Sequence, residues 1–547
     1  MPRPFGPALA CLALLLTAPA PDLGAQARAR PDSRLDRLKR DAIADVEARA
    51  AHTARMVDQI FSFGELGFQE FETSRYLVDL LRREGFTVEE GFSGIPTAWV
   101  ARWGSGKPVI ALGSDIDAIP KASQMPGVAC RKPMIAGAPG HGEGHNSGQA
   151  VNVTAALAVK RLMEREGLPG TLMLWPGVAE EQLGTKGFFA RDGMFRDVDA
   201  SFFTHVWDVF ATAWGQPDGY SGMVSLVYSF DGESAHGAGA PWRGRSALDA
   251  VELMNLAWNY RREHLRTQQR SHYVVSNGGD QPNVVPSQAS VWYFLRELDA
   301  PRVRDLMAIA DSIAEGAAMM TGTRYAGSRM IGSAWPPHFS KPLAEALDRN
   351  IQRVGMPAWS DDDQRFAKAL QKEMGVDERG LDSVASPLMA PPKAESGNNF
   401  GSDDIGDVSW SVPTAQLFFP SNIPGTPGHN WADAVAMATP LAHKGATAGA
   451  KALALTVLDV LLDPALVPAA WDYYRTVQTK DIKYEPFVRP GDAPAVELNA
   501  GILGTYRDQM KPFYYQPDRY ASYLEQLGVR YPTVRAADGS CGPAVTP

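Results

Sequence analysis

The sequence predicts an α/β protein whose mostly parallel sheet is flanked by helices, with a smaller α+β domain of ferredoxin-like type inserted into it. Three observations favour this fold. Short apolar runs of buried-strand type alternate with helical segments up to about residue 222. From residue 223 the pattern changes to β-α-β-β-α. After about residue 335 the first pattern returns, as expected when one domain interrupts another.

The strands of the larger domain are predicted from short, continuous apolar runs. These runs cover Val109–Gly113, Thr171–Trp175 and Ser201–Phe203. Helical spacing covers residues 28–55, and a helix-rich stretch continues to Glu84. A further helix is expected over residues 149–165, where small apolar residues would pack on the sheet.

The smaller domain is predicted from a change in periodicity. Val224, Leu226, Tyr228 and Phe230 alternate with polar residues, as in a half-exposed strand. After them we expect a helix, two β runs and a second helix, at Ser246 to about His264, His272–Ser276, Ala289–Leu295 and about Val303–Met320.

The N-terminus predicts export. Arg3 precedes an apolar run from Ala8 to Ala18 that is too short to span a bilayer, and Ala-Gln-Ala at 25–27 matches a cleavage site. We therefore interpret residues 1–27 as a secretory signal peptide. The expected location is periplasmic or extracellular, with no membrane contact after cleavage. An unstructured apolar N-terminus and a lipid anchor on Cys11 are the weaker alternatives.

Composition excludes some classes of function. The chain has 547 residues, enough for two or more domains, and its net charge is −9 with a pI of about 5.7. This charge and the lack of a basic stripe disfavour nucleic acid as a partner. Cleavage would leave Cys130 and Cys541, which an exported protein is able to pair, although the sequence does not show that they meet. Without a CxxC spacing, any metal would be held by His, Asp and Glu.

Half of the ten histidines lie in glycine-rich loops or at predicted strand ends, where α/β proteins build their sites. These five are His141, His145, His205, His236 and His429. The other five have ordinary helical, strand or loop surroundings: His52, His264, His272, His338 and His443.

Carboxylates occupy similar places. Asp115 and Asp117 follow one predicted strand, Glu180 and Glu181 follow another, and Glu143 is two residues from His145. Each feature alone has an ordinary explanation, such as a capped strand end or a solvated turn. Together they offer the nitrogen and oxygen ligands that Zn or Mn prefers. One neighbouring carboxylate would remain to move a proton in metal-assisted hydrolysis.

The order of five motifs resembles the M20 metallopeptidases, and best their amidohydrolase branch. The motifs are Ser-Asp-Ile-Asp-Ala-Ile-Pro at 114–120, Gly-His-Gly-Glu-Gly-His-Asn at 140–146, Ala-Glu-Glu at 179–181, Ser-Ala-His at 234–236 and Pro-Asn-Val-Val-Pro at 282–286. The resemblance covers about residues 35–465. It implies a catalytic domain with two divalent metal ions, Zn or Mn. It also implies an inserted lid domain that forms a homodimer or a higher homo-oligomer.

The resemblance also implies roles for single residues. Glu180 matches the general base, and Asp117 matches an acid beside the metals. His236 matches a lid histidine that stabilises the developing oxyanion in the partner subunit's site. Asn283 matches a lid residue that binds substrate, and Gly-Ser-Asp-Asp at 401–404 resembles a stretch before the last ligand. The implied metal ligands are Glu143, His145, Glu181, His205 and His429.

Two basic residues close after His236 are candidates for substrate binding. Arg243 and Arg245 would hold a substrate carboxylate. A surface or interface role is the alternative, and the sequence favours it.

Glu143 departs from the amidohydrolase branch, in which this position is normally a metal-bridging Cys. A Glu carboxylate would bridge through its two oxygens and favour harder ions such as Mn. A bridging thiolate is open to oxidation outside the cytoplasm, whereas a carboxylate is not. We therefore hypothesise that this exchange is linked to export. The alternative is a degraded site.

These inferences define the expected domains and activity. The catalytic domain would occupy residues 28–222 and 336–470, the lid domain 223–335, and a C-terminal extension 471–547 that wraps the surface. The expected reaction is hydrolysis of an amide bond in an N-acyl amino acid, an aminobenzoyl-glutamate-like conjugate or a short peptide. The alternatives are a catalytically impaired homologue that binds metal or ligand, and a deaminase-type hydrolase on the same site.

Overall fold

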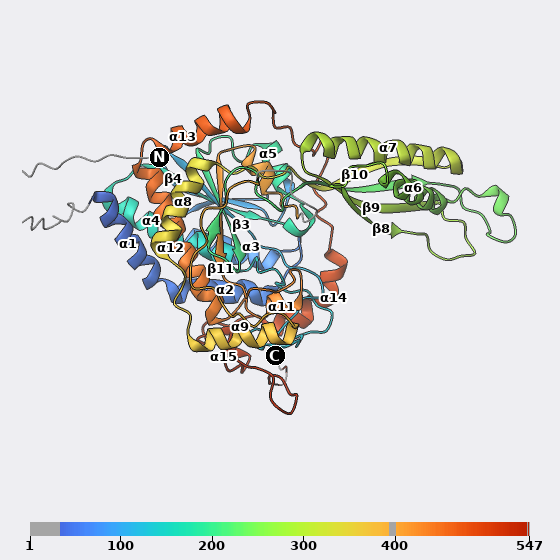
Figure 1. Cartoon of the computed structure of the whole chain (residues 1–547). Coiled ribbons are helices and arrows are strands. Elements are labelled where there is room, and N and C mark those ends of the chain that lie inside the picture. Colours follow the sequence, from blue (N-terminus) through green and yellow to red (C-terminus); the bar gives the residue numbers. More distant parts are fainter. Residues whose placement is uncertain (1–32, 393–400, 544, 546–547) are drawn as a thin grey trace, which may run out of the picture.

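The computed structural model describes residues 33–392, 401–543 and 545, and it forms a large and a small domain, each built on one sheet (Figure 1). The predicted signal peptide at 1–27, including Cys11, lies outside the described residues. The small domain projects from one side of the large domain (Figure 1).

The large domain contains a seven-stranded sheet in the order β1-β2-β4-β3-β5-β11-β6. Its four middle strands pair in parallel: β4 (Gly170–Gly177), β3 (Val109–Asp115), β5 (Ala200–Trp207) and β11 (Thr414–Pro420). The edge strands β1 (Thr87–Glu90), β2 (Trp99–Ser105) and β6 (Ala211–Thr212) pair antiparallel. The predicted α/β class is confirmed, and the three predicted strands lie inside β3, β4 and β5.

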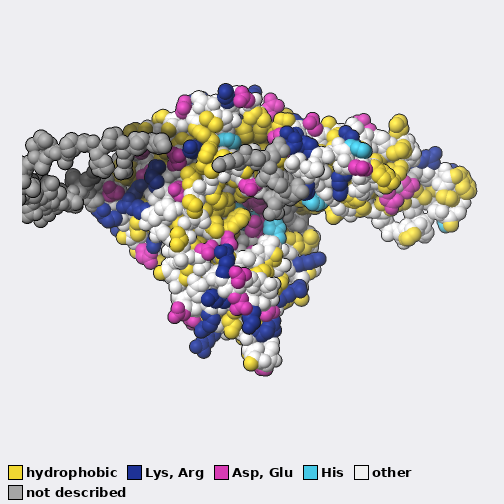
Figure 2. All heavy atoms as spheres, viewed as in Figure 1, with side chains coloured by type: hydrophobic (Ala, Val, Ile, Leu, Met, Phe, Trp, Pro, Cys, Tyr) yellow, Lys and Arg dark blue, Asp and Glu magenta, His cyan; other side chains and the backbone are white. Residues whose placement is uncertain are grey.

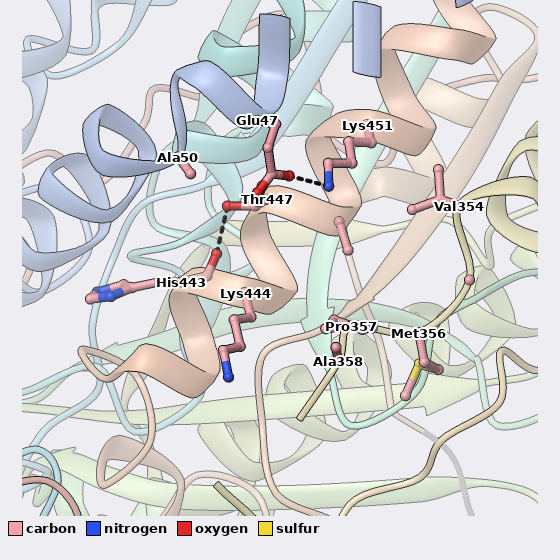
Figure 3. A pocket seen from close by; sticks show the side chains of 12 residues that line it. Glu47, Ala50, Val354, Met356, Pro357, Ala358, His443, Lys444, Thr447 and Lys451 are labelled. Carbon is pink, nitrogen blue, oxygen red and sulfur yellow. Dashed lines mark hydrogen bonds and ion pairs between the residues drawn. The ribbon is translucent and has the colours of Figure 1, made fainter. Parts of the chain in front are cut away.

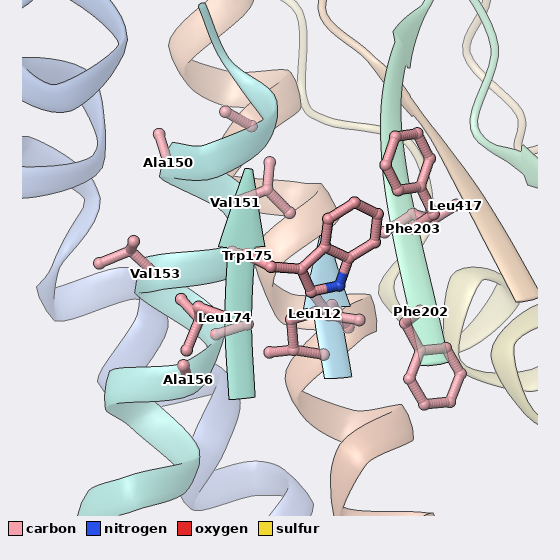
Figure 4. Close-up of a cluster of buried hydrophobic side chains, with 14 of the residues drawn as sticks. Leu112, Ala150, Val151, Val153, Ala156, Leu174, Trp175, Phe202, Phe203 and Leu417 are labelled. Carbon is pink, nitrogen blue, oxygen red and sulfur yellow. The ribbon is translucent and has the colours of Figure 1, made fainter. Parts of the chain in front are cut away.

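Helices cover this sheet and bury its apolar residues. Side chains of α4 (Gly148–Glu166), such as Val151, meet Leu112 of β3 and Leu174 of β4 in one hydrophobic cluster (Figure 4). By length and composition α12 (Pro440–Leu462) could cross a membrane, but most of it is buried against α4, α1, α8 and β11. The other helices of this domain are α1 (Arg34–Ala48), α2 (Ala50–Phe63), α3 (Phe71–Arg83), α5 (Lys186–Asp192), α8 (Lys341–Val354), α9 (Asp361–Met374), α10 (Ile405–Ser409) and α11 (Trp431–Ala434).

The small domain is a four-stranded antiparallel sheet in the order β10-β7-β9-β8, packed against two helices. The chain runs through β7 (Gly222–Asp231), α6 (Ala247–Arg262), β8 (Arg270–Asn277), β9 (Gln288–Glu297), α7 (Ala300–Thr321) and β10 (Arg324–Ala334). This is the expected ferredoxin-like arrangement. The last strand was not predicted, because arginines, glycines and serines interrupt the apolar residues of β10 and leave no regular alternation.

The C-terminal extension contacts both domains. After α13 (Leu466–Tyr473), Phe487 and Val488 join the hydrophobic cluster of the small domain. Glu497 then pairs with Arg329 of β10, and α14 (Ala500–Met510) follows. The chain passes α15 (Tyr523–Gln526), and its end is tied to the large domain by the disulfide Cys130–Cys541, with an S–S distance of 2.00 Å.

Candidate metal centre and active site

The predicted site residues follow the carboxyl ends of the parallel strands. Asp117 comes two residues after β3, Glu180 and Glu181 form a short turn after β4, and His205 lies near the end of β5. These strand ends share one edge of the sheet, so side chains that are distant in sequence meet there. The loop at 140–146 and the loop that carries His429 after β11 reach the same edge.

Glu143 lies at the centre of the five predicted ligands. Its Oε2 is 3.3 Å from Nε2 of His145 and 3.2 Å from Nε2 of His429, while its Oε1 is 3.6 Å from Nε2 of His205. Nε2 of His429 is also 3.5 Å from Oε2 of Glu181. The two oxygens of Glu143 therefore face different histidines.

The two buried histidine rings are held so that Nε2 points at this centre. Nδ1 of His145 lies 3.3 Å from Oδ1 of Asp117, whose Oδ2 accepts the backbone N–H of Glu181 at 3.1 Å. Nδ1 of His205 donates to the carbonyl oxygen of Val206 at 2.8 Å. A hydrogen bond on Nδ1 leaves the Nε2 lone pair free for a ligand.

The donor set fits divalent cations. One atom each of Glu143, His145 and Glu181 lies within 4.8 Å of the others. Nε2 of His145 and Oε1 of Glu181 are buried, and neither has a hydrogen-bond partner among the described residues. Buried polar atoms without a partner are costly, and a bound cation would satisfy both of them. Carboxylate and imidazole donors suit Zn or Mn.

The backbone around the centre adopts restricted conformations and leaves little room for side chains. A Cβ on Gly144 (φ +113°) would lie 2.5 Å from Sδ of Met437, so only glycine fits there. Ala179 adopts φ 51° at the start of the turn that carries Glu180 and Glu181. The fully buried Glu70 fixes this turn, because its Oε1 accepts the N–H of Ala179 at 2.8 Å. Sequence reasoning missed Glu70, whose partner is 109 residues away.

Glu180 is a buried carboxyl in an acidic cluster. One oxygen each of Glu180, Asp403 and Asp404 lies within 4.8 Å of the others. Burial raises the pKa of Glu180 well above its usual value, and the charges of Asp115 and Asp403 raise it further. A raised pKa suits a group that takes up a proton and later releases it.

A lysine that the sequence pattern does not single out balances this cluster. Lys186 is fully buried, its Nζ lies 2.6 Å from Oδ1 of Asp115, and it also pairs with Asp404. Nearby negative charge raises the pKa of Lys186 well above its usual value despite burial. The one signal that could have identified it is its place as a lone Lys beside the apolar residues that open α5.

The predicted residues of the small domain lie away from this centre. The exposed side chains are those of His236, Asn283 and Arg243. None of them lines the cavity that opens over the centre of the same subunit. Nδ1 of His236 accepts the N–H groups of Ala238 and Gly239 at 3.1 and 2.9 Å. The proton of a neutral His236 ring therefore sits on Nε2, which is free to donate.

A cavity of about 590 Å³ opens over the centre, between the large domain and β9. Arg296 of β9 lines it and donates from Nη1 to Oγ of Ser402 at 3.0 Å. The Nε of Arg296 is buried and has no hydrogen-bond partner among the described residues. Sequence reasoning missed Arg296, because alternating strand residues such as those of β9 are ordinarily solvated on the polar face.

Two other features carry no chemistry. His141 is buried against the carbonyl oxygen of Ile60 at 3.2 Å, and burial lowers its pKa to about 3. A hollow of about 470 Å³ beside α12 is lined by Lys451 and Lys444. Lys451 already pairs with Glu47 (Figure 3), and Lys444 pairs with Asp363.

The fold and the site define a class of protein, with a mostly parallel sheet, an inserted ferredoxin-like domain, and His and carboxylate side chains gathered at one edge of the sheet. Residues 219–318 match the M20 peptidase dimerisation domain. The chain is 35% identical over 459 residues to one subunit of the p-aminobenzoyl-glutamate hydrolase of Escherichia coli (strain K12), covering 77% of this chain and 92% of that protein. It is 28% identical over 444 residues to Xaa-Arg dipeptidase of Mus musculus, covering 79% and 91%.

A solved structure shows the same fold. The crystal structure of an aminobenzoyl-glutamate utilization protein from Klebsiella pneumoniae matches with a TM-score of 0.52 at 18% identity, covering 79% of this chain and 99% of that chain. The chain therefore belongs to the M20 family of peptidases and amidohydrolases. It is an enzyme that acts on amide bonds.

Proposed function

We propose that the protein is an exported, metal-dependent amidohydrolase that cleaves the amide bond of an N-acyl amino acid, an aminobenzoyl-glutamate-like conjugate or a short peptide. The convergence of three histidines on the two oxygens of Glu143, with Glu181 beside one of these histidines, carries this proposal. The names of the relatives, an aminobenzoyl-glutamate hydrolase and a dipeptidase, support the substrate class.

Two divalent ions, Zn or Mn, would be held by Glu143, His145, Glu181, His205 and His429. When bound, such ions would polarise a carbonyl oxygen and lower the pKa of an attacking water. Oε1 of Glu143 faces His205 and Oε2 faces His145 and His429, so both oxygens of this carboxylate would be available as ligands. Asp117 holds the ring of His145 in its ligating orientation.

Glu180 accepts the proton of the attacking water and donates it to the nitrogen of the leaving amine. Burial and the charges of Asp115 and Asp403 raise its proton affinity, and Lys186 limits that rise. Arg296 lines the large cavity and would bind the carboxylate of the leaving amino acid, since its buried Nε has no hydrogen-bond partner in the part of the chain that the structure describes. The leaving amine and its carboxylate therefore occupy the large cavity, together with Glu180.

We further propose that the enzyme works as a homodimer or higher homo-oligomer in which His236 of one subunit donates its Nε2–H to the oxyanion formed in the other. The matched dimerisation domain supports this assembly. Exposed apolar side chains of the small domain also support it, among them Trp242, Tyr260, Val274 and Val275, and Figure 2 shows hydrophobic surface along the projecting domain. Asn283 lies beside His236, since its carbonyl oxygen accepts the N–H of Gly237. It would join the same partner site.

Export is supported by the apolar N-terminal run and by the disulfide Cys130–Cys541, because disulfides persist outside the reducing cytoplasm. Secretion of the full chain into the periplasm, with loss of residues 1–27 shown by mass spectrometry, tests this part. Retention of the intact N-terminus in the cytoplasm would contradict it.

Chelation and reloading test the function. We expect EDTA to abolish release of glutamate from 4-aminobenzoyl-glutamate, and Zn or Mn to restore it. Glu180→Gln should keep its metal but lose about 10²- to 10⁴-fold in kcat. Glu164→Gln, on the exposed face of α4, is the matched control. A folded protein that binds no metal when Zn and Mn are supplied, or one that releases ammonia in place of the amino acid, would overturn the proposal.

A further inference from the structure

A second hollow, of about 280 Å³, adjoins the metal centre and is lined by residues of the large domain. Glu143, His205 and Trp207 line both this hollow and the large cavity. A substrate whose scissile bond lies at Glu143 and His205 therefore extends one end into each space. Since the amine side occupies the large cavity with Glu180 and Arg296, the acyl side is left with the second hollow.

The second hollow is acidic and holds no basic side chain. The described residues that line it include Glu143, Asp208 and Asp433 but no Lys or Arg. The large cavity has more acids, with Glu180, Glu181, Asp218 and Asp403 beside Glu143, but it also has one cation, Arg296. The cation that approaches Asp208 is Arg379, whose Nη2 is 3.9 Å from Oδ2 of Asp208 and whose Nη1 is 3.1 Å from Asp382. The hollow therefore keeps a net negative charge.

Each of the two aspartates has one carboxylate oxygen that accepts no hydrogen bond from the described residues. Asp433 is 3% exposed; its Oδ1 accepts from Nδ2 of Asn422 at 2.9 Å, and its Oδ2 has no hydrogen-bond partner among the described residues. Oδ1 of Asp208 is likewise buried and without such a partner. A buried carboxylate oxygen without a donor is costly, and a ligand that supplies donors and positive charge would relieve that cost.

Trp207 completes the site. Its side chain is 47% exposed, and its ring is fixed edge-on against Phe418, with centroids 5.2 Å apart. The ring stands at the boundary of the two spaces and offers a surface on which a cation is able to stack.

We propose that this hollow is the acyl-side subsite and that it binds a cationic nitrogen, an ammonium or a guanidinium, on the acyl part of the substrate. The proposal rests on the amidohydrolase function above. The enzyme would then prefer substrates with a positive charge at the acyl end and a carboxylate at the amine end, such as short peptides or aminoacyl conjugates.

Binding of two acids tests the proposal without turnover. The acids are 4-(aminomethyl)benzoate and 4-ethylbenzoate, which share length and carboxylate and differ in one ammonium. By isothermal titration of the metal-loaded enzyme at pH 7.5 we expect the ammonium compound to bind about tenfold tighter, or about 1.4 kcal/mol. Asp433→Asn keeps an oxygen that can accept from Asn422 but removes the charge. It should reduce this ratio to less than about threefold.

Asp208→Asn is the second variant and should reduce the ratio as well. Asp382→Asn is the matched control, because Asp382 pairs with the same Arg379 but does not line the hollow. Its ratio should stay that of the wild type. Equal affinities of the two acids in the wild type, or a ratio unchanged in both Asp433→Asn and Asp208→Asn, would overturn the proposal. Failure to hydrolyse amides would refute the proposed function but would leave this binding ratio measurable.

Discussion

The buried pair of Glu65 and Arg507 ties the C-terminal extension to the large domain, and its removal gives a pH-dependent prediction. The side chain of Glu65 is 1% exposed. It accepts from Nη1 of Arg507 at 2.7 Å and from the backbone N–H groups of Glu72 and Thr73. Burial raises the pKa of Glu65 to about 7 even though Arg507 lowers it.

Arg507→Met removes the cation and keeps most of the apolar stem. The pKa of Glu65 should then rise further. At a pH where Glu65 is ionised in the wild-type fold, each unit of this rise lowers the free energy of unfolding by about 1.4 kcal/mol. The sign follows from proton linkage: a carboxyl with a raised pKa in the folded state loses stability as pH rises through that pKa. We expect the free energy of unfolding of Arg507→Met to be about 2 kcal/mol lower than that of the wild type at pH 8.5. The difference should be much smaller at pH 5.5, where Glu65 is protonated in both proteins.

Scanning calorimetry at the two pH values measures this difference. A loss of 2 kcal/mol corresponds to a fall in melting temperature of about 4 °C for a large domain. Adding Glu65→Gln to Arg507→Met should remove the pH dependence. Lys511→Met is the control, because Lys511 pairs with the exposed Asp508. An equal loss at both pH values, or no rescue by the double variant, would refute the reasoning.

Two further predictions concern the disulfide and the centre. Replacing Cys130 and Cys541 by Ser should destabilise the protein by about 2–5 kcal/mol, and wild type melted with reductant should fall to the level of the variant. Glu143→Cys should lose activity in hydrogen peroxide at concentrations that the wild type survives, because a thiolate oxidises and a carboxylate does not. Equal activity and equal resistance of this variant would contradict the link between Glu143 and export.

The sequence predicted the parts of the fold that depend on local pattern. The strands β3, β4 and β5 are continuous apolar runs because both faces of a parallel sheet are buried. The same logic located the candidate ligands, since polar residues directly after such runs gather at one edge. The strand β11 was not predicted, because the buried, polar Gln416 interrupts its apolar run.

Contacts between distant residues were beyond the sequence pattern. Glu65 and Arg507 are 442 residues apart, and Cys130 and Cys541 are 411 residues apart. No periodicity links such positions, because their proximity depends on the complete packing of both domains. The same holds for Lys186, whose buried charge is balanced by Asp115 and by Asp404, which is 218 residues away.

The C-terminal extension explains how a strained active-site turn is held. Ala179 and Leu183 both adopt φ 51° around Glu180 and Glu181, a conformation that costs about 1–3 kcal/mol per residue and needs support from its surroundings. Nδ2 of Asn499 in the extension donates to Oε1 of Gln182 at 3.3 Å and to the carbonyl oxygen of Gly67 at 3.1 Å.

Two residues earlier, Glu497 pairs with Arg329 of β10, so one segment contacts both the turn and the small domain. The extension therefore links the small domain, which carries Arg296 and His236, by direct contacts to the turn that carries the proposed general base.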